Sequence, residues 1–148
     1  MHDDTTGSGT ARRKTRFFDS SPAPDEAVAN RQYQELLRTV HPRKVVDHDL
    51  RSRVQTRLLL GEGPMHLTEV RMAPGTQVPR HRHGADQIVI VREGSLWQGN
   101  RELRAGAGFF TPAGAAYGFR AGPEGATFHE FFFGAVEEWA PEVIEDDA

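Results

Sequence analysis

Residues 75–94 read GTQVPRHRHGADQIVIVREG, and this stretch decides the fold. His81 and His83 are two positions apart, so on a β-strand both imidazoles project from the same face. Gln87 follows after three residues, which are enough to turn the chain and bring a neighbouring strand alongside. Two imidazoles and a third donor from the next strand would surround one side of a metal ion and leave positions open for water or substrate. The spacing therefore predicts a metal site made of His81, His83 and Gln87.

Short β-rich runs surround this stretch from residue 45 onward and are separated by Gly, Pro and Asn. Closely spaced strands with no helices between them indicate an antiparallel barrel or sandwich. The predicted strands are Val54–Leu60, Met65–Met72, Gln77–His83, Gln87–Arg92, Ser95–Gln98, Gly108–Thr111, Ala116–Arg120 and Ala126–Phe133. We therefore expect an all-β fold, with residues 45–136 forming one barrel domain.

A second pattern, GAGFFTPAGAAY, occupies residues 106–117. Together with residues 75–94 it resembles the two sequence motifs of the cupin superfamily, G-x5-H-x-H-x3-E-x6-G and G-x5-P-x-G-x2-H. Every spacing is kept, and the resemblance covers roughly residues 54–134. It implies a double-stranded β-helix, or jelly-roll barrel, that holds one divalent metal ion such as Zn, Fe, Mn or Ni. Because this fold carries enzymes, storage proteins and ligand sensors, the resemblance implies the fold more strongly than the activity.

Two letters depart from these motifs: Gln87 stands in place of the usual glutamate, and Tyr117 in place of the usual histidine. An amide oxygen carries no charge, so the ion would keep more positive charge and act as a stronger Lewis acid. Tyr117 could ligate the ion as a phenolate, or stand beside it as a hydrogen-bond donor or general acid. Both changes are also compatible with a cupin whose metal site has decayed.

Strand alternation gives His66 two interpretations. His66 shares a strand face with Thr68 and Val70, which makes it either an interior candidate for the metal shell or a histidine at the barrel rim. The same alternation turns Glu69 and Arg71 toward water.

His129 and Glu130 are adjacent in a predicted strand, so only one of them can point into the barrel. An inward His129 opposite Tyr117 would complete a site of three histidines and Gln87. An inward Glu130 would instead place a carboxyl group there for proton transfer. The sequence does not set this register. We include His129 among the predicted metal ligands and name Tyr117 and Glu130 as the candidate catalytic residues.

The two ends of the chain lie outside the barrel domain. Residues 1–20 lack periodicity and are predicted to be a disordered tail. Residues 21–44 are predicted to form a helical arm, because Asp25 can cap a helix whose apolar residues recur at helical spacing. Residues 137–148 are acidic and are predicted to be a mobile surface segment.

Composition excludes several classes of protein. The chain has 148 residues, a net charge of −3 and no cysteine. The charge argues against a nucleic-acid partner, and the absence of cysteine removes disulfides, thiolate zinc sites and thiol nucleophiles. No apolar run approaches the ~18 residues of a membrane span, and no signal-peptide core follows Met1. We therefore expect a cytoplasmic protein without membrane or nucleic-acid partners.

These observations favour a metal-dependent enzyme that acts on a small oxygenated molecule. A neutral third ligand favours Lewis-acid chemistry, as in a cyclase or isomerase of natural-product tailoring, over a non-haem dioxygenase or a lyase. The alternative is a non-catalytic cupin that senses a small molecule or a metal. The resemblance also implies a homodimer.

Overall fold

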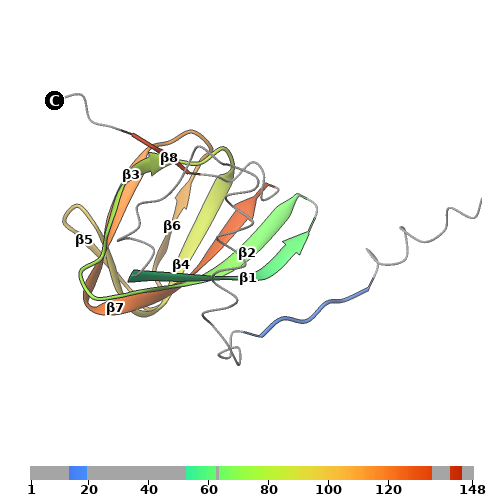
Figure 1. Cartoon of the computed structure of the whole chain (residues 1–148), viewed down its shortest axis with the longest axis horizontal. Coiled ribbons are helices and arrows are strands. Elements are labelled where there is room, and N and C mark those ends of the chain that lie inside the picture. Colours follow the sequence, from blue (N-terminus) through green and yellow to red (C-terminus); the bar gives the residue numbers. More distant parts are fainter. Residues whose placement is uncertain (1–13, 20–52, 63, 135–140, 145–148) are drawn as a thin grey trace, which may run out of the picture.

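The computed structural model describes residues 14–19, 53–62, 64–134 and 141–144, and these contain eight β-strands (Figure 1). The strands are β1 (Val54–Glu62), β2 (Met65–Met72), β3 (Gln77–Arg82), β4 (Asp86–Gln98), β5 (Arg101–Arg104), β6 (Gly108–Thr111), β7 (Tyr117–Phe133) and β8 (Glu142–Val143). Among the described residues, no helix has the length and apolar character needed to cross a membrane. The predicted helical arm, residues 21–44, lies outside the described residues.

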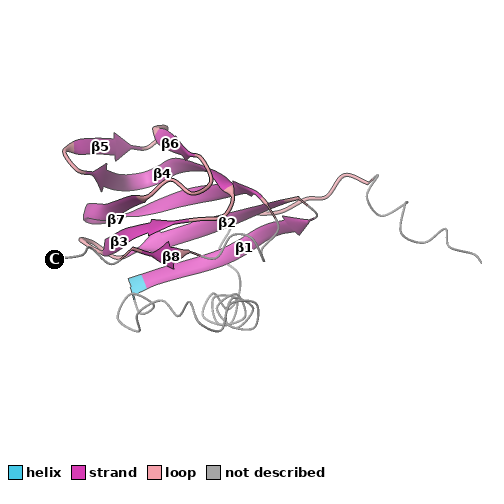
Figure 2. Ribbon diagram, turned by 90° about the horizontal axis from the view of Figure 1, so that it is seen from above, coloured by secondary structure: helices cyan, strands magenta, loops and turns pink. Residues whose placement is uncertain are grey.

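All strand pairs are antiparallel, and the longest strand, β7, connects them. The order β1-β2-β7-β3-β8 forms one path, and β4 pairs with β5, β6 and β7. The C-terminal half of β7 lies between β2 and β4, whereas its N-terminal end pairs with β3. Figure 2 shows the strands side by side, with β4, β5 and β6 at one side of the molecule and β1 at the other. The predicted all-β jelly-roll architecture is confirmed.

The core lies on the inner face of the β2–β7–β4 sheet. Side chains that face the core alternate along each strand with side chains on the outer face, as strand geometry requires. The buried apolar members are Val70 and Met72 on β2, Val89, Val91 and Leu96 on β4, and Phe119, Ala121, Ala126 and Phe128 on β7. Together they form one apolar layer that supports the polar residues at the other end of the barrel interior.

Gly94, the last residue of the first motif, is required by packing. It has a φ of 69°, and a Cβ placed on it would lie 2.0 Å from the carbonyl oxygen of Gly125 on β7. Only glycine fits so close an approach at positive φ. The register of β4 against β7 also shifts here, between Gly94 and Leu96. The motif glycine thus holds the two strands together and takes no part in the chemistry.

Several elements differ from the sequence predictions. The predicted runs within 87–98 merge into the single strand β4, and those within 116–133 merge into β7, because the intervening turn signals become register irregularities and leave the strands unbroken. Strand β5 was not predicted. Glu142 and Val143, within the segment predicted to be mobile, form strand β8 by pairing with Arg82 and His81 of β3.

Candidate metal centre

His81 and His83 lie at the end of β3 and project from the same side of the strand. Both are buried, while Arg80 and Arg82 between and beside them are exposed. The two Nε2 atoms are 3.1 Å apart. Strand alternation predicted a shared face, and the structure brings the two Nε2 atoms together on it.

The His81 ring has one proton donor and one free lone pair. Its Nδ1 lies 2.7 Å from the carbonyl oxygen of Pro79, so the Nδ1–H donates to that oxygen and the lone pair is on Nε2. Burial lowers the pKa of His81 below its usual value, against a smaller opposing effect of the Pro79 hydrogen bond. A neutral imidazole whose second nitrogen is fixed by a carbonyl oxygen is the state in which histidine binds metal.

The histidine pair fits a divalent metal ion. Two nitrogens 3.1 Å apart, each about 2.0–2.1 Å from a common ion, subtend roughly 100° there, which lies between the octahedral and tetrahedral angles. The described residues hold no cluster of three His, Cys, Asp or Glu side chains with the geometry of a metal site. A third protein ligand in this part of the chain would therefore be of another residue type, and Gln87 and Tyr117 are the candidates by motif position.

Gln87 lies near the start of β4 and is completely buried on the inner face. Its backbone is in register with Phe132 of β7 on one side and Thr111 of β6 on the other. The Tyr117 hydroxyl donates a hydrogen bond of 2.5 Å to Gln87 Oε1. Because an amide oxygen has two lone pairs, Oε1 can accept this bond and still bind a metal ion.

Tyr117, the first residue of β7, connects Gln87 to the histidine pair. Its backbone is in register with His81, and the two ring centroids are 4.5 Å apart. Burial raises the pKa of Tyr117 well above 10, and the nearby Glu130 raises it further, against the opposing hydrogen bond to Gln87. In the metal-free protein the phenol therefore keeps its proton at neutral pH, which fits a hydrogen-bond donor.

Glu130 points into the barrel from β7, which is one of the two orientations that the sequence left open. It is buried, and its Oε2 accepts a hydrogen bond of 3.4 Å from the Thr68 hydroxyl of β2. Burial raises the pKa of Glu130 to about 7, although the Thr68 hydrogen bond opposes this. A carboxyl group that titrates near neutral pH is suited to accept and return a proton.

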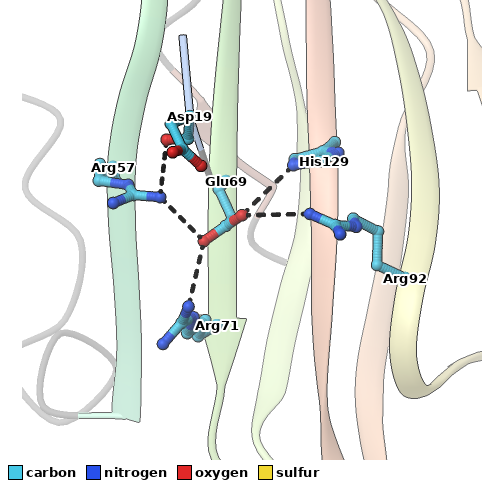
Figure 3. A network of polar contacts seen from close by, with 6 residues as sticks. All are labelled: Asp19, Arg57, Glu69, Arg71, Arg92 and His129. Atoms are coloured by element: carbon cyan, nitrogen blue, oxygen red, sulfur yellow. Dashed lines mark hydrogen bonds and ion pairs between the residues drawn. The ribbon is translucent and has the colours of Figure 1, made fainter. Parts of the chain in front are cut away.

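His129, named from the sequence as a metal ligand, lies on the outer face, and the assignment is corrected. Its Nε2 is 3.4 Å from Glu69 Oε2 (Figure 3). The alternation of side chains along β7 places it on the side opposite Glu130. The reason is a change of alternation within β7. Phe119 and Ala121 face the core at odd positions, but Phe128 and the residues after it do so at even ones. The irregular stretch between them shifts the phase by one residue.

His66 belongs to the interior, which decides between its two predicted interpretations. It is fully buried, stacks on Phe132 with 4.7 Å between ring centroids, and has its Nδ1 3.0 Å from the carbonyl oxygen of Gly134. His66 and Gln87 both lie opposite Phe132 in the register of β2, β7 and β4. These contacts place His66 next to the candidate site, where packing against Phe132 holds its ring.

The sequence missed a network of charges on the outer face. Glu69 was expected to face water but is buried, because three arginines and a histidine from four strands converge on its carboxylate (Figure 3). The partners are Arg57 at 3.5 Å, Arg71 at 3.5 Å, Arg92 at 3.6 Å and His129 at 3.4 Å. The Arg57 guanidinium also donates to the carbonyl oxygen of Asp19. The one sequence signal was the number of arginines on strands that neighbour Glu69.

Comparison with known proteins identifies the fold. No protein-family model and no curated protein sequence match the chain. Among solved structures, the DMSP lyase DddQ from Ruegeria pomeroyi DSS-3 is similar with a TM-score of 0.60 at 22% identity, over 73% of this chain and 60% of DddQ. KdgF from Halomonas sp. gives 0.56 at 18% identity, over 84% of this chain and 98% of KdgF.

An RmlC-like cupin from Shewanella frigidimarina NCIMB 400 gives a TM-score of 0.52 at 23% identity, over 57% of this chain and 78% of that protein. The chain therefore has the cupin fold, as the two sequence motifs predicted. It spans well under two thirds of DddQ, and at these identities the likeness concerns the fold alone.

Proposed function

We propose that this protein is a metal-dependent enzyme that moves a proton on a small oxygenated molecule. The observation that carries the proposal is the 3.1 Å approach of the His81 and His83 Nε2 atoms beside two groups that can hold a proton, the half-buried Tyr117 and the buried Glu130. A buried cluster of this composition is more typical of a reaction site than of a packed core.

In this proposal His81, His83 and the Oε1 of Gln87 hold one divalent ion. When bound, the ion supplies a Lewis acid that polarises a carbonyl oxygen or stabilises an enolate. All three protein ligands are neutral, so none of them reduces the charge of the ion. This favours Lewis-acid chemistry over oxygen activation, in which iron is commonly bound by a carboxylate.

Glu130 and Tyr117 have different roles in this proposal. With a pKa of about 7, Glu130 is present in both protonation states near neutral pH, so it can take a proton from a carbon acid and return it to another position. Tyr117 keeps its proton and donates a hydrogen bond, which holds Gln87 in place. The surrounding apolar side chains, such as Phe132, exclude water from the proton transfer.

The reaction class that follows is an isomerisation, cyclisation or elimination. Each of these begins with removal of a proton next to an oxygenated carbon. One of the similar structures is named as a lyase, which supports this range of reactions. Natural-product intermediates rich in carbonyl groups are one source of such substrates.

Metal analysis tests the site itself. The protein would be purified without a chelating column and its metal content measured by inorganic mass spectrometry. We expect about one divalent ion per chain, lost in His81→Ala and His83→Ala. The matched control is His129→Ala, which removes a histidine from the outer face and should leave the metal content unchanged. Equal metal in the His81→Ala variant and the unaltered protein would refute the site.

A proton-exchange measurement separates an enzyme from a sensor. The metal-loaded protein would be incubated in D2O with pyruvate, and loss of the methyl proton signal would be followed by NMR. We expect exchange above the rate of the free ion, lost in Glu130→Gln while metal binding persists. Metal binding without any exchange for a panel of 2-oxo acids would favour the non-catalytic sensor.

A further inference from the structure

The amide group of Gln87 has one end bonded and one end without a hydrogen-bond partner. The side chain is completely buried, its Oε1 accepts from the Tyr117 hydroxyl, and its Nε2 has no hydrogen-bond partner among the described residues. Buried N–H groups are nearly always paired in native proteins, because leaving one unpaired costs free energy. An unpaired donor at the centre of a candidate site therefore points to a missing acceptor.

The orientation of the amide follows from its neighbour. The phenol of Tyr117 carries a proton, and its hydroxyl lies 2.5 Å from the amide, so the amide atom that meets it is the accepting oxygen. The NH2 group is then the end that points away from Tyr117. Glu130, the nearest carboxyl on the same face, is bonded to Thr68 and lies in register with Val89, two residues beyond Gln87.

From this geometry we propose that Gln87 binds a carboxylate of the substrate through Nε2. The acceptor would come from a ligand, because no group among the described residues pairs with Nε2, and a carboxylate oxygen is a stronger acceptor for an N–H donor than a neutral oxygen. A glutamate, which the cupin motif has at this position, would offer no N–H and would repel a carboxylate. The inference rests on the proposed function, because it takes this end of the barrel interior as the substrate site.

Gln87 is thus assigned as the residue that selects the substrate. It would favour small oxo acids over neutral carbonyl compounds of the same shape. This explains why an amide replaces the motif glutamate: a neutral third ligand and a substrate-binding donor are the two ends of one side chain. The substrate class is a small carboxylate whose carbonyl or enolate oxygen lies next to the carboxylate.

The test follows the Gln87 side chain directly. The full-length protein, labelled with 15N, would be titrated with pyruvate and separately with its uncharged methyl ester, in metal-free and zinc-loaded forms. The Gln87 NH2 resonance is assigned by its absence in Gln87→Glu. We expect a saturable downfield shift of one Nε2 proton with pyruvate and none with the ester. An unchanged resonance at saturating pyruvate, or an equal shift with the ester, overturns the proposal.

Two variants measure the contribution to affinity. Gln87→Glu keeps the acceptor for Tyr117 but replaces the donor by a negative charge, and should weaken pyruvate binding at least about 10-fold by calorimetry. Gln87→Met removes the donor without adding a charge and should weaken it by a smaller factor. Pyruvate binding as tight as in the unaltered protein, in either folded variant, overturns the proposal. If Gln87→Glu does not fold, the pyruvate affinity of Gln87→Met and the shift of the Gln87 resonance still test the proposal.

Failure of this inference is distinguishable from failure of the proposed function. Zinc content is measured on the same samples, so an unaltered protein that binds no metal refutes the metal site whatever pyruvate does. A protein that binds zinc while pyruvate leaves Gln87 unperturbed keeps the metal site and loses the substrate assignment.

Discussion

The inner and outer faces of the β2–β7–β4 sheet each carry a buried glutamate, but the groups that surround the two carboxylates differ. On the inner face Glu130 is buried with one hydroxyl partner, Thr68, and its pKa is raised to about 7. On the outer face Glu69, one residue beyond Thr68, is equally buried but is surrounded by the guanidinium groups of Arg57, Arg71 and Arg92 (Figure 3). Burial without a counter-charge prepares a carboxyl for proton transfer, whereas burial among cations makes it an ion-pair centre.

Histidines differ between the two faces in the same way. His81 presents a free Nε2 lone pair to His83, while the nearest charged neighbours of His129 are Glu69 and Arg92. Residue type does not separate the proposed ligand His81 from the less buried His129. The face of the strand does, and the predictions below test that distinction from the largest expected effect to the smallest.

Glu69→Ala should be the most destabilising change. It leaves three guanidinium groups facing one another around an emptied position, and removing one partner of a buried ion pair costs about 3–5 kcal/mol. Because Arg71 and Arg92 are more than a third exposed, we expect about 2–4 kcal/mol by urea unfolding, with metal content unchanged. The control is Glu102→Ala, which breaks a surface pair with Arg104 and should cost under about 1 kcal/mol.

Glu130→Gln should change how the stability of the metal-free protein depends on pH. The pKa of Glu130 is raised to about 7, so between about pH 4.5 and 7 the folded protein holds a proton that the unfolded chain has released. The free energy of unfolding should therefore fall as pH rises through this window, by at most about 3 kcal/mol, and level off above it. The variant should lack this fall. Parallel pH profiles for the two proteins would contradict the buried, neutral carboxyl.

Tyr117→Phe should have an intermediate effect. It removes the donor to Gln87 Oε1 and leaves a buried acceptor without that partner, at a cost of about 1–2 kcal/mol. Thermal unfolding measures the loss. Metal content should persist, because in the proposed site the ion is held by His81, His83 and Gln87. Complete loss of metal in this variant would show that the phenol oxygen is itself a ligand.

His129→Gln should have the smallest effect. Burial and the nearby Arg92 lower the pKa of His129, so the unfolded chain binds a proton more readily, and stability falls as pH drops through about 6.5. The variant should lose that acid sensitivity and change stability by less than about 1 kcal/mol at pH 8. Loss of bound metal in it would return His129 to the site.

The sequence was sufficient for the fold and for the first half of the site. His81 lies in the short strand β3 and His83 directly follows it, so alternation determines their shared face, and motif spacing places Gln87 near the start of the next strand. Simple alternation then fails in β7. Counted in steps of two from Tyr117, His129 would point inward, but the irregular stretch 122–125 shifts the phase and turns Glu130 inward instead. That shift depends on contacts between β7 and β4, such as Gly125 against Gly94, which are not local in sequence.

The burial of Glu69 could not be predicted from the sequence, for a related reason. Alternation correctly placed it on the outer face, but a residue on the outer face is not exposed to water when three arginines and a histidine from four strands cover its carboxylate. Which side chains converge depends on the register between β1, β2, β7 and β4, and only the folded sheet determines that register.

The hydrogen bond between Tyr117 and Gln87 has an evolutionary consequence. The two letters that depart from the cupin motifs are 30 positions apart, yet they touch. Directly bonded residues do not contribute independently, so the effect of a substitution at position 87 depends on the residue at position 117. Among homologous chains the two positions should therefore change together more often than unconnected positions do.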